Sequence, residues 1–495
     1  MNKLNIANDY IKNNSNFVNE QYRLKYHFIP PIGWINDPNG FSYYKGEYHL
    51  FYQYYPYDSC WGPMHWGHAV SSDLVKWEHK AVALAPDEEY DADGCFSGSA
   101  IEKDGVLYLM YTGHVNTNKE KPENVRQTQC IAYSEDGITF NKIKENPVLT
   151  ERNLPENALP QDFRDPKVFK KDEYYYTVVG SRNKDDSGQI LLYKSEDLIE
   201  WKYVGIMIAS ENKLGKMWEC PDLFELNGKY VLIVSPQFCE KEEDRYWNIH
   251  SSLYFVGNVD FNTGKFSCEH VDQIDYGHDF YAPQTLIDDK NRRIAITWMQ
   301  MWERNIPTHD KKHNWAGAMT IPRELELKGD ALYQKPISEL ETYKTNKVSF
   351  NNLTVDGSLR INELSGECIN LEVILDCKNS ERFGIKFVYS AHEYTSIYYD
   401  CENEKLILDR SNSGEKIEGS EKDVEVGVRR VLVKCNDNKL KLNILIDRCS
   451  IEVFINDGAK TMTSTIYPNN PSADIEFFSN GEVEIVELKK WDICL

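Results

Sequence analysis

Three acidic residues of this chain have side chains that could do chemistry and a spacing that would bring them together. Asp37, Asp165 and Glu219 each lie seven to nine residues before the turn of a predicted β-hairpin. Carboxyl groups at equivalent places of repeated strands converge, and burial and mutual repulsion then separate their pKa values. Each acid alone is more often solvated or turn-capping, and Asp37-Pro38 and Asp165-Pro166 resemble turns. The shared spacing favours a catalytic site over three separate turns.

Motifs for other chemistries are weaker. The sequence has no H-E-x-x-H and no phosphate-cradling glycine loop, and CFSGSA (95–100) lacks the first glycine of a nucleophile elbow. His65 and His68 have the spacing of metal ligands but no third ligand cluster, so packing or hydrogen bonding is the expected role. We expect neither a metal nor a cofactor.

The hairpins themselves recur five times. Their turns lie at Gly46, Gly105, Asp172, Gly228 and Asn291, at intervals of 59, 67, 56 and 63 residues. A second pattern, SSDLVKW (71–77), SEDGITF (134–140) and SEDLIEW (195–201), recurs in phase with the first. Two markers with one period predict an all-β fold with radially repeated sheets, a five-bladed β-propeller, rather than one irregular β domain.

The pattern changes after Pro336. Residues 337–345 read as a linker, and residues 346–495 carry closely spaced alternating strands typical of a β-sandwich. We therefore expect a catalytic propeller domain over 1–336 and a sandwich domain over 346–495, the latter with a packing role.

Composition excludes some partners. A net charge of −22 disfavours nucleic acid and anionic membranes, which require a basic face. Twelve cysteines without C-x-x-C pairs indicate reduced thiols. No signal-peptide core and no apolar stretch of about 18 residues is present, so we expect a cytoplasmic protein.

Six further motifs are specific enough to indicate a protein family. Together, and in order along residues 30–336, they resemble glycoside hydrolase family 32, which contains invertases, fructanases and sucrose-6-phosphate hydrolases. The motifs are WINDPNG (34–40), FYQ (51–53), FSGSA (96–100), FRDPKV (163–168), MWECPDLF (217–224) and DFYAPQT (279–285).

The resemblance implies roles for the three acids in a retaining hydrolysis of fructosyl bonds. Asp37 would be the nucleophile, Glu219 the acid/base and Asp165 the transition-state stabiliser. Glu219 would start protonated, with Met217 and Trp218 as an apolar wall. The substrate-binding residues implied by the motifs and their surroundings are Trp34, Asn36, Gln53, Trp61, Phe96, Ser97, Arg164, Tyr281 and Trp302.

The substrate is the least decided point. Segments 61–79, 83–100 and 301–303 look most like sucrose-6-phosphate hydrolases, and a β-fructofuranosidase acting on sucrose or short fructans is the alternative. A propeller lectin that binds fructosides without cleaving them, and an inverting pentosidase with carboxyl groups about 6.5–9.5 Å apart, are alternatives of other kinds. His65, His68 and Arg126 are candidates for phosphate contacts, and the oligomeric state is open.

Overall fold

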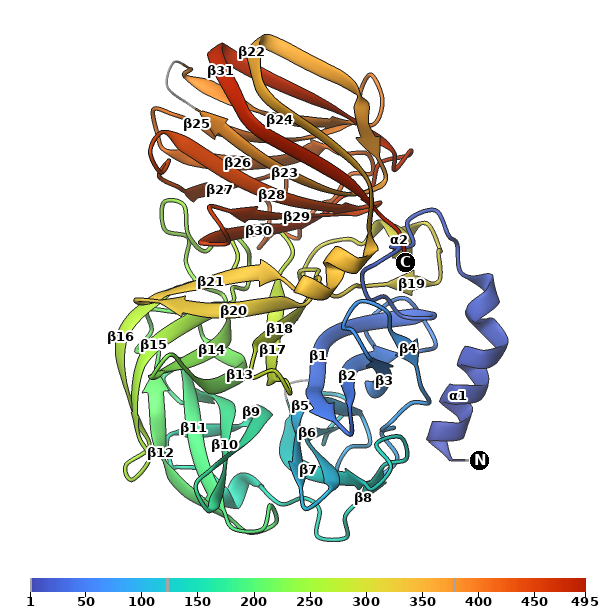
Figure 1. Ribbon diagram of the computed structural model, residues 1–495. Helices are drawn as coiled ribbons and strands as arrows, with labels where there is room; N and C mark the ends of the chain where they lie inside the picture. Colours follow the sequence, from blue (N-terminus) through green and yellow to red (C-terminus); the bar gives the residue numbers. More distant parts are fainter. Residues whose placement is uncertain (1, 122–123, 377–379) are drawn as a thin grey trace.

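The computed structural model describes residues 2–121, 124–376 and 380–495. The chain is built mostly of strands, which form five small sheets around a common centre and one large sheet beyond them (Figure 1). The predicted order, a five-bladed propeller followed by a sandwich, is confirmed.

Each blade is an antiparallel sheet of four consecutive strands, interrupted only in blade 5 by β19. Blades 1 and 2 contain β1 (Gly33–Tyr44), β2 (Glu47–Tyr55), β3 (His65–Ser71), β4 (Glu78–His79), β5 (Gly94–Lys103), β6 (Val106–Asn116), β7 (Val125–Ser134) and β8 (Asn141–Lys142). Blades 3 to 5 contain β9 (Ala158–Lys171), β10 (Tyr174–Asn183), β11 (Gly188–Ser195), β12 (Trp201–Ala209), β13 (Met217–Leu226), β14 (Lys229–Gln237), β15 (Leu253–Asp260), β16 (Lys265–Gln273), β17 (Tyr281–Ile287), β18 (Arg293–Trp298), β20 (Arg323–Lys328) and β21 (Ala331–Pro336).

Both repeated patterns have a structural basis. The five hairpin turns join the first two strands of each blade, β1 to β2 through β17 to β18. The second pattern ends the third strand of blades 1 to 3. There the hydroxyl oxygens of Ser71, Ser134 and Ser195 accept the backbone N–H three residues later, at 2.8, 2.8 and 2.9 Å. These serines turn the chain toward the outermost strand of the blade.

Every innermost strand is broken by a β-bulge at a matching place. The ladder shifts register around Asp37-Pro38 in β1, Ser97-Gly98 in β5, Asp165-Pro166 in β9, Cys220-Pro221 in β13 and Ala282-Pro283 in β17. Proline cannot donate to a ladder and is tolerated at a bulge, which also re-aims neighbouring side chains. The segments that resembled turns are therefore bulges within strands.

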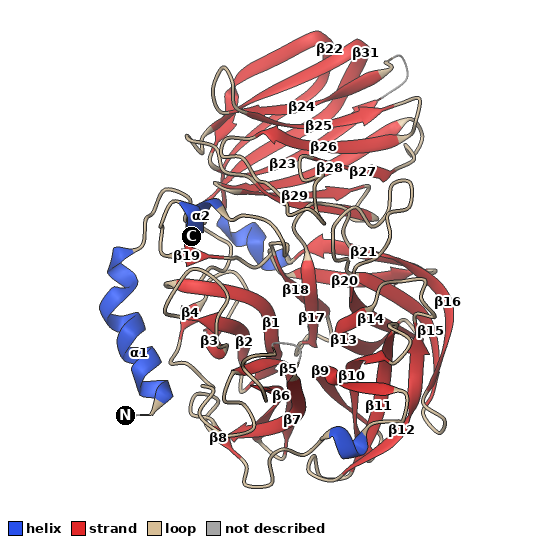
Figure 2. Ribbon diagram, turned by 180° about the vertical axis from the view of Figure 1, so that it is seen from behind, coloured by secondary structure: helices blue, strands red, loops and turns tan. Residues whose placement is uncertain are grey.

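The ring closes through β19 (Trp315–Ala316), which pairs parallel with β1 at its inner edge. The helix α1 (Lys3–Asn14), which the sequence reading did not predict, lies outside blade 1 (Figures 1 and 2). Its Asn8 side chain accepts the Val82 N–H at 2.9 Å. The remaining helical segments are short: η1 (Ser15–Phe17), η2 (Glu151–Asn153), α2 (Pro307–Asp310) and η3 (Ser338–Tyr343).

The C-terminal sheet folds over into two packed layers. Its strands are β22 (Lys344–Gly366), β23 (Cys368–Asp376), β24 (Arg382–Val388), β25 (Tyr394–Asp400), β26 (Lys405–Asn412), β27 (Val428–Leu432), β28 (Lys439–Asp447), β29 (Ser450–Ile455), β30 (Lys460–Thr465) and β31 (Ala473–Ile493). The long strand β31 pairs with β24 through its first half and with β23 through its second, so it belongs to both layers. Buried side chains such as Phe383 and Ile397 from one layer and Leu371 and Ile444 from the other form one core.

Buried charges join the propeller to the sandwich. Arg323 pairs with Glu452 at 2.5 Å, and Arg304 pairs with Asp423 at 2.6 Å, with all four side chains at most 1% exposed. A side chain at Gly277 would place its Cβ 2.1 Å from the backbone of Thr463, so the two backbones approach closely there. Because an unpaired buried charge is costly, each domain requires the other at this contact.

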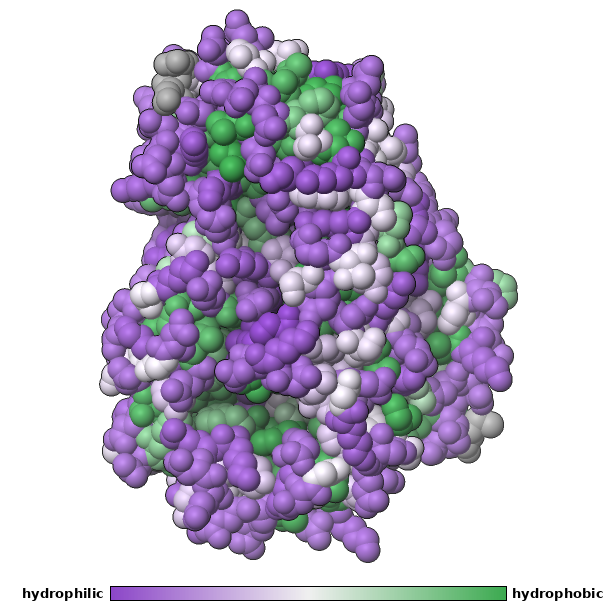
Figure 3. All heavy atoms as spheres, viewed as in Figure 1, coloured by the Kyte–Doolittle hydropathy of each residue, from purple (hydrophilic) through white to green (hydrophobic). Residues whose placement is uncertain are grey.

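The surface is strongly polar. The face in Figure 3 is mainly hydrophilic, with hydrophobic residues in scattered groups. No helix in the described part of the chain is long and apolar enough to cross a membrane.

Candidate active site

A cavity of about 410 Å³ is formed by the inner strands of the propeller and the loops that border them. It brings together ten of the twelve candidate residues, including all three carboxylates. These are Asn36, Asp37, Gln53, Trp61, Phe96, Ser97, Arg164, Asp165, Glu219 and Trp302.

Asp37 lies at the bulge of β1 and is 9% exposed. Its Oδ2 accepts hydrogen bonds from Ser97 Oγ at 2.6 Å and Cys220 Sγ at 3.5 Å, and its Oδ1 accepts one from Asn36 Nδ2 at 3.1 Å. Burial raises the pKa of Asp37, the negative charge of Glu219 adds to this, and the Ser97 hydrogen bond opposes it. The contacts hold the carboxylate in one orientation, as an attacking group requires.

Asp165 occupies the bulge of β9 with φ of 64°, a left-handed conformation that is uncommon for a residue with a side chain. Its Oδ2 accepts the backbone N–H of Cys220 at 3.0 Å. Burial and the charge of Glu219 raise the pKa of Asp165 to about 7, although Arg164 acts against the shift. The protein thus holds a carboxylate where its charge is disfavoured until a positive charge develops beside it.

Glu219 has hydrogen bonds on both oxygens. Arg164 donates to Oε1 from Nε at 2.9 Å and from Nη2 at 2.8 Å, and the Tyr281 hydroxyl donates to Oε2. Tyr281 also lies 3.1 Å from the carbonyl oxygen of Ser235. Its proton can therefore turn to Ser235 when Glu219 carries a proton on Oε2, so this environment accommodates both forms of the acid.

Trp218 does not form the expected apolar wall beside Glu219. Trp218 is fully buried in the core between blades 3 and 4, where its indole N–H donates to the carbonyl oxygen of Leu214. Because side chains alternate along a strand, the neighbours of an inward-facing residue point away from it.

Trp34 and Tyr281 lie behind the cavity lining. The indole N–H of Trp34 donates to Asn36 Oδ1 at 2.8 Å, and the Trp34 ring packs against Trp302 with ring centres 5.8 Å apart. Both residues therefore contact groups that line the cavity.

Cys220, which contacts two of the carboxylates, and several lining residues were missed by the sequence reading. Cys220 contacts both Asp37 and Asp165, at 3.5 and 3.6 Å from their Oδ2 atoms. Its position directly after Glu219 in a recognised motif was a usable signal. Gln127 and Phe238 lie on other strands or loops, and nothing in their local sequence marks them. The other missed residues that carry a polar group are Gln161, Asp162, Gln237, His250 and Glu303.

His65 and His68 are buried within blade 1. The His68 ring stacks on Phe51 with centres 4.3 Å apart, and burial lowers the pKa of both histidines. The expected packing role fits these contacts. Among the described residues no group of three or more His, Cys, Asp or Glu side chains could hold a metal ion.

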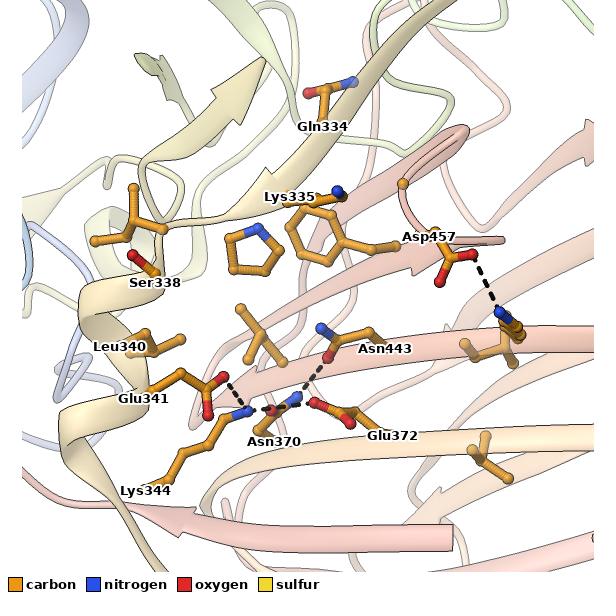
Figure 4. Close-up of a pocket in the computed structure, with 18 of the residues that line it drawn as sticks. Gln334, Lys335, Ser338, Leu340, Glu341, Lys344, Asn370, Glu372, Asn443 and Asp457 are labelled. Atoms are coloured by element: carbon orange, nitrogen blue, oxygen red, sulfur yellow. Dashed lines mark hydrogen bonds and ion pairs between the residues drawn. The ribbon is translucent and has the colours of Figure 1, made fainter. Parts of the chain in front are cut away.

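A second hollow of about 480 Å³ lies where the connector η3 meets the sandwich (Figure 4). Its charged side chains largely satisfy each other, as Lys344 contacts Glu341 and Glu372 and Lys441 contacts Asp457. None of the twelve candidate residues lines it.

Comparison with known proteins agrees with this arrangement. The profile described as "Glycosyl hydrolases family 32 N-terminal domain" matches residues 27–336, and that of the "Glycosyl hydrolases family 32 C terminal" matches residues 338–492. The chain belongs to glycoside hydrolase family 32.

Relatives within family 32 match over nearly their whole length. A sucrose-6-phosphate hydrolase of Zymomonas mobilis is 37% identical over 94% of this chain and 91% of that protein. A raffinose invertase of Escherichia coli is 37% identical over 94% of both chains. The protein is accordingly a glycoside hydrolase.

Solved family 32 structures share the fold. A Bombyx mori β-fructofuranosidase superimposes with a TM-score of 0.84 and 35% identity, covering 99% of this chain and 97% of that one. A sucrose-6-phosphate hydrolase from Lactobacillus gasseri gives 0.87 at 29% identity, covering 98% and 96%.

Proposed function

We propose that this family 32 enzyme hydrolyses the β-fructofuranosidic bond of sucrose 6-phosphate with retention of configuration. The observation that carries the proposal is the meeting of Asp37, Asp165 and Glu219 in one cavity. A retaining mechanism requires a nucleophilic carboxylate and a second carboxyl group that serves first as acid and then as base.

In the first step Asp37 attacks the anomeric carbon of the fructosyl unit, and the bond to the bridging oxygen breaks. Glu219 gives its proton to that oxygen, which leaves as a hydroxyl of the glucosyl part. In the second step Glu219 takes a proton from water, and the water oxygen displaces Asp37. Asp165 stabilises the positive charge that develops on the fructosyl ring in both transition states.

The other candidate residues have positioning and binding roles. Arg164 and Tyr281 orient Glu219, while Ser97 and Asn36 orient Asp37, with Trp34 behind Asn36. Gln53 is fixed by donating to the carbonyl oxygen of Cys95 at 3.0 Å. The rings of Trp61, Phe96 and Trp302 supply the aromatic surfaces on which a sugar can pack.

The phosphorylated substrate is favoured over sucrose by the relatives of this chain, several of which are sucrose-6-phosphate hydrolases. The test is a hydrolysis assay with both substrates at matched concentrations. We expect a higher kcat/KM for sucrose 6-phosphate; equal or better efficiency on sucrose would assign the enzyme to unphosphorylated sucrose or short fructans.

Two further points remain proposals. The catalytic unit would span 1–336 and the sandwich 346–495, joined by 337–345. Ten cysteines of the described residues, Cys435 left aside, are free thiols, which supports a reducing compartment such as the cytoplasm. The hydrolase relatives give no support to a lectin that binds fructosides without cleaving them.

A further inference from the structure

Among the described residues, those that line the catalytic cavity offer no unpaired cation that could bind a phosphate group. The ionisable lining residues are five acids, Arg164 and His250. Arg164 is paired with Glu219 and Asp162, and burial lowers the pKa of His250, which favours its neutral form. If the substrate is phosphorylated, as proposed above, its phosphate has to be met by a residue that borders the cavity.

The candidates from the propeller sequence do not meet this requirement. His65 and His68 are buried inside blade 1, 3% and 0% exposed. Arg126 lies on β7 between Val125 and Gln127, which both line the cavity. Alternation along the strand turns Arg126 to the other face, where its Nη2 donates to the carbonyl oxygen of Glu89 at 3.3 Å.

A loop of the sandwich reaches the cavity rim instead. Residues 413–427 connect β26 to β27 and dock on the segment after β18. The backbone N–H of Ser420 donates to the carbonyl oxygen of Glu303, a lining residue, at 2.8 Å. The buried pair of Arg304 with Asp423 fixes the same loop. The loop is therefore held against the catalytic domain by backbone and side-chain contacts.

Lys422 precedes the anchored Asp423 and extends over Phe238. Its ammonium lies 5.3 Å from the centre of the Phe238 ring, which lines the cavity and is 37% exposed. Within the described residues no carboxylate pairs with Lys422, which is solvent exposed, and a contact with a ring face leaves its N–H groups able to donate elsewhere. Glu303, which lines the cavity, can accept hydrogen bonds from sugar hydroxyls.

We propose that Lys422, supplied by the sandwich, binds the phosphate group of the substrate at the mouth of the propeller cavity. The sandwich then determines substrate choice as well as stability. The inference rests on the proposed function, because it assigns the residue that distinguishes sucrose 6-phosphate from sucrose.

The test compares four variants by kcat/KM for both substrates. Lys422→Met keeps a stem over Phe238 and removes the charge, whereas Lys422→Arg keeps the charge. Arg126→Met removes the competing cation, and Lys416→Met is a control on the same loop, where Lys416 is 81% exposed and pairs with Glu418.

For Lys422→Met the preference for sucrose 6-phosphate over sucrose should fall about tenfold, through KM, as expected for loss of a charge-assisted hydrogen bond near solvent. Lys422→Arg should keep the preference within about threefold. The Arg126 and Lys416 variants should keep the wild-type ratio.

An unchanged ratio in Lys422→Met, a fall in Arg126→Met instead, or a wild-type enzyme without preference for the phosphorylated sugar would overturn the inference. Failure of the proposed function is distinguishable, because it appears in the wild-type enzyme itself as no preference for sucrose 6-phosphate, whereas an unchanged ratio in Lys422→Met beside a wild-type preference overturns only the role of Lys422. Calorimetry of glucose 6-phosphate and glucose binding gives a readout independent of turnover. Lys422→Met should weaken the binding of glucose 6-phosphate and leave that of glucose unchanged.

Discussion

Replacing Asp165 by Asn should stabilise the protein at neutral pH while it abolishes catalysis. The pKa of Asp165 is raised from 3.8 to about 7 by burial and by Glu219. Between these values the folded protein binds more protons than the unfolded chain, so the free energy of unfolding falls as pH rises from about 4 to 7. At 1.36 kcal/mol per pKa unit, the ionised side chain costs about 4 kcal/mol above pH 7. Asparagine has nearly the same shape, does not ionise, and can accept the Cys220 N–H through its carbonyl oxygen.

The assay is urea unfolding of wild type and Asp165→Asn at several pH values from 4 to 8. The two should be similar near pH 4, and the variant should gain on wild type up to about pH 7. Asp162→Asn is the matched control. Burial opposes ionisation of Asp162, but Arg164 and Arg182 lower its pKa overall, so that variant should lose stability above pH 4. If Asp165→Asn is no more stable than wild type at pH 8, the reasoning about this carboxylate fails.

Four further outcomes are expected. Asp37→Ala and Glu219→Gln should fold normally and lose about 10³-fold or more in kcat, with azide restoring part of the activity of Glu219→Gln; near-normal rates would remove the residue from its role. Reaction in methanol and water should give the β-methyl fructoside first, because two inversions retain configuration, and an initial α product would exclude Asp37 as nucleophile. The kcat/KM profile should be bell-shaped, with its acidic limb above pH 3.8 because burial raises the pKa of Asp37, and Glu219→Gln should lose the basic limb; a persisting basic limb would point to another acid. Although burial alone would lower it, the hydrogen bonds that His27 donates to the carboxylates of Asp447 and Glu452 raise the pKa of His27 from 6.5 to about 9, so about 3 kcal/mol of stability present below pH 6.5 should be lost as pH rises to 9. An unfolding midpoint that stays constant over that range in wild type would contradict the His27 assignment.

The propeller could be predicted because its hairpins form between strands that are neighbours in the sequence. Each hairpin brings its own turn and its own alternating strands, so the periodic recurrence of Gly46 and its counterparts carried the architecture. For the same reason, the position of Asp37, Asp165 and Glu219 seven to nine residues before those turns predicted that they lie on inner strands.

What could not be predicted depends on contacts between distant segments. Phe238 lines the cavity because the chain after β14 bends inward, and its local sequence has no catalytic pattern. The loop that carries Lys422 reaches the cavity only after the sandwich folds against the propeller, nearly two hundred residues further along the chain. Similarly, Trp218 was expected beside Glu219, but it points to the opposite face of the strand and lies in the core between blades 3 and 4.

The bulge shared by the five inner strands lets the repeated blades contribute different side chains to one site. Blades 1, 3 and 4 present the acids near this break, while blade 2 contributes Ser97 to Asp37 and blade 5 contributes Tyr281 to Glu219. A fourth acid in place of either neutral donor would add repulsion where a hydrogen bond is needed. If the five blades descend from one duplicated blade, each copy already had the bulge. Substitution of side chains at the bulge would then be enough to give the blades different roles without a change of backbone.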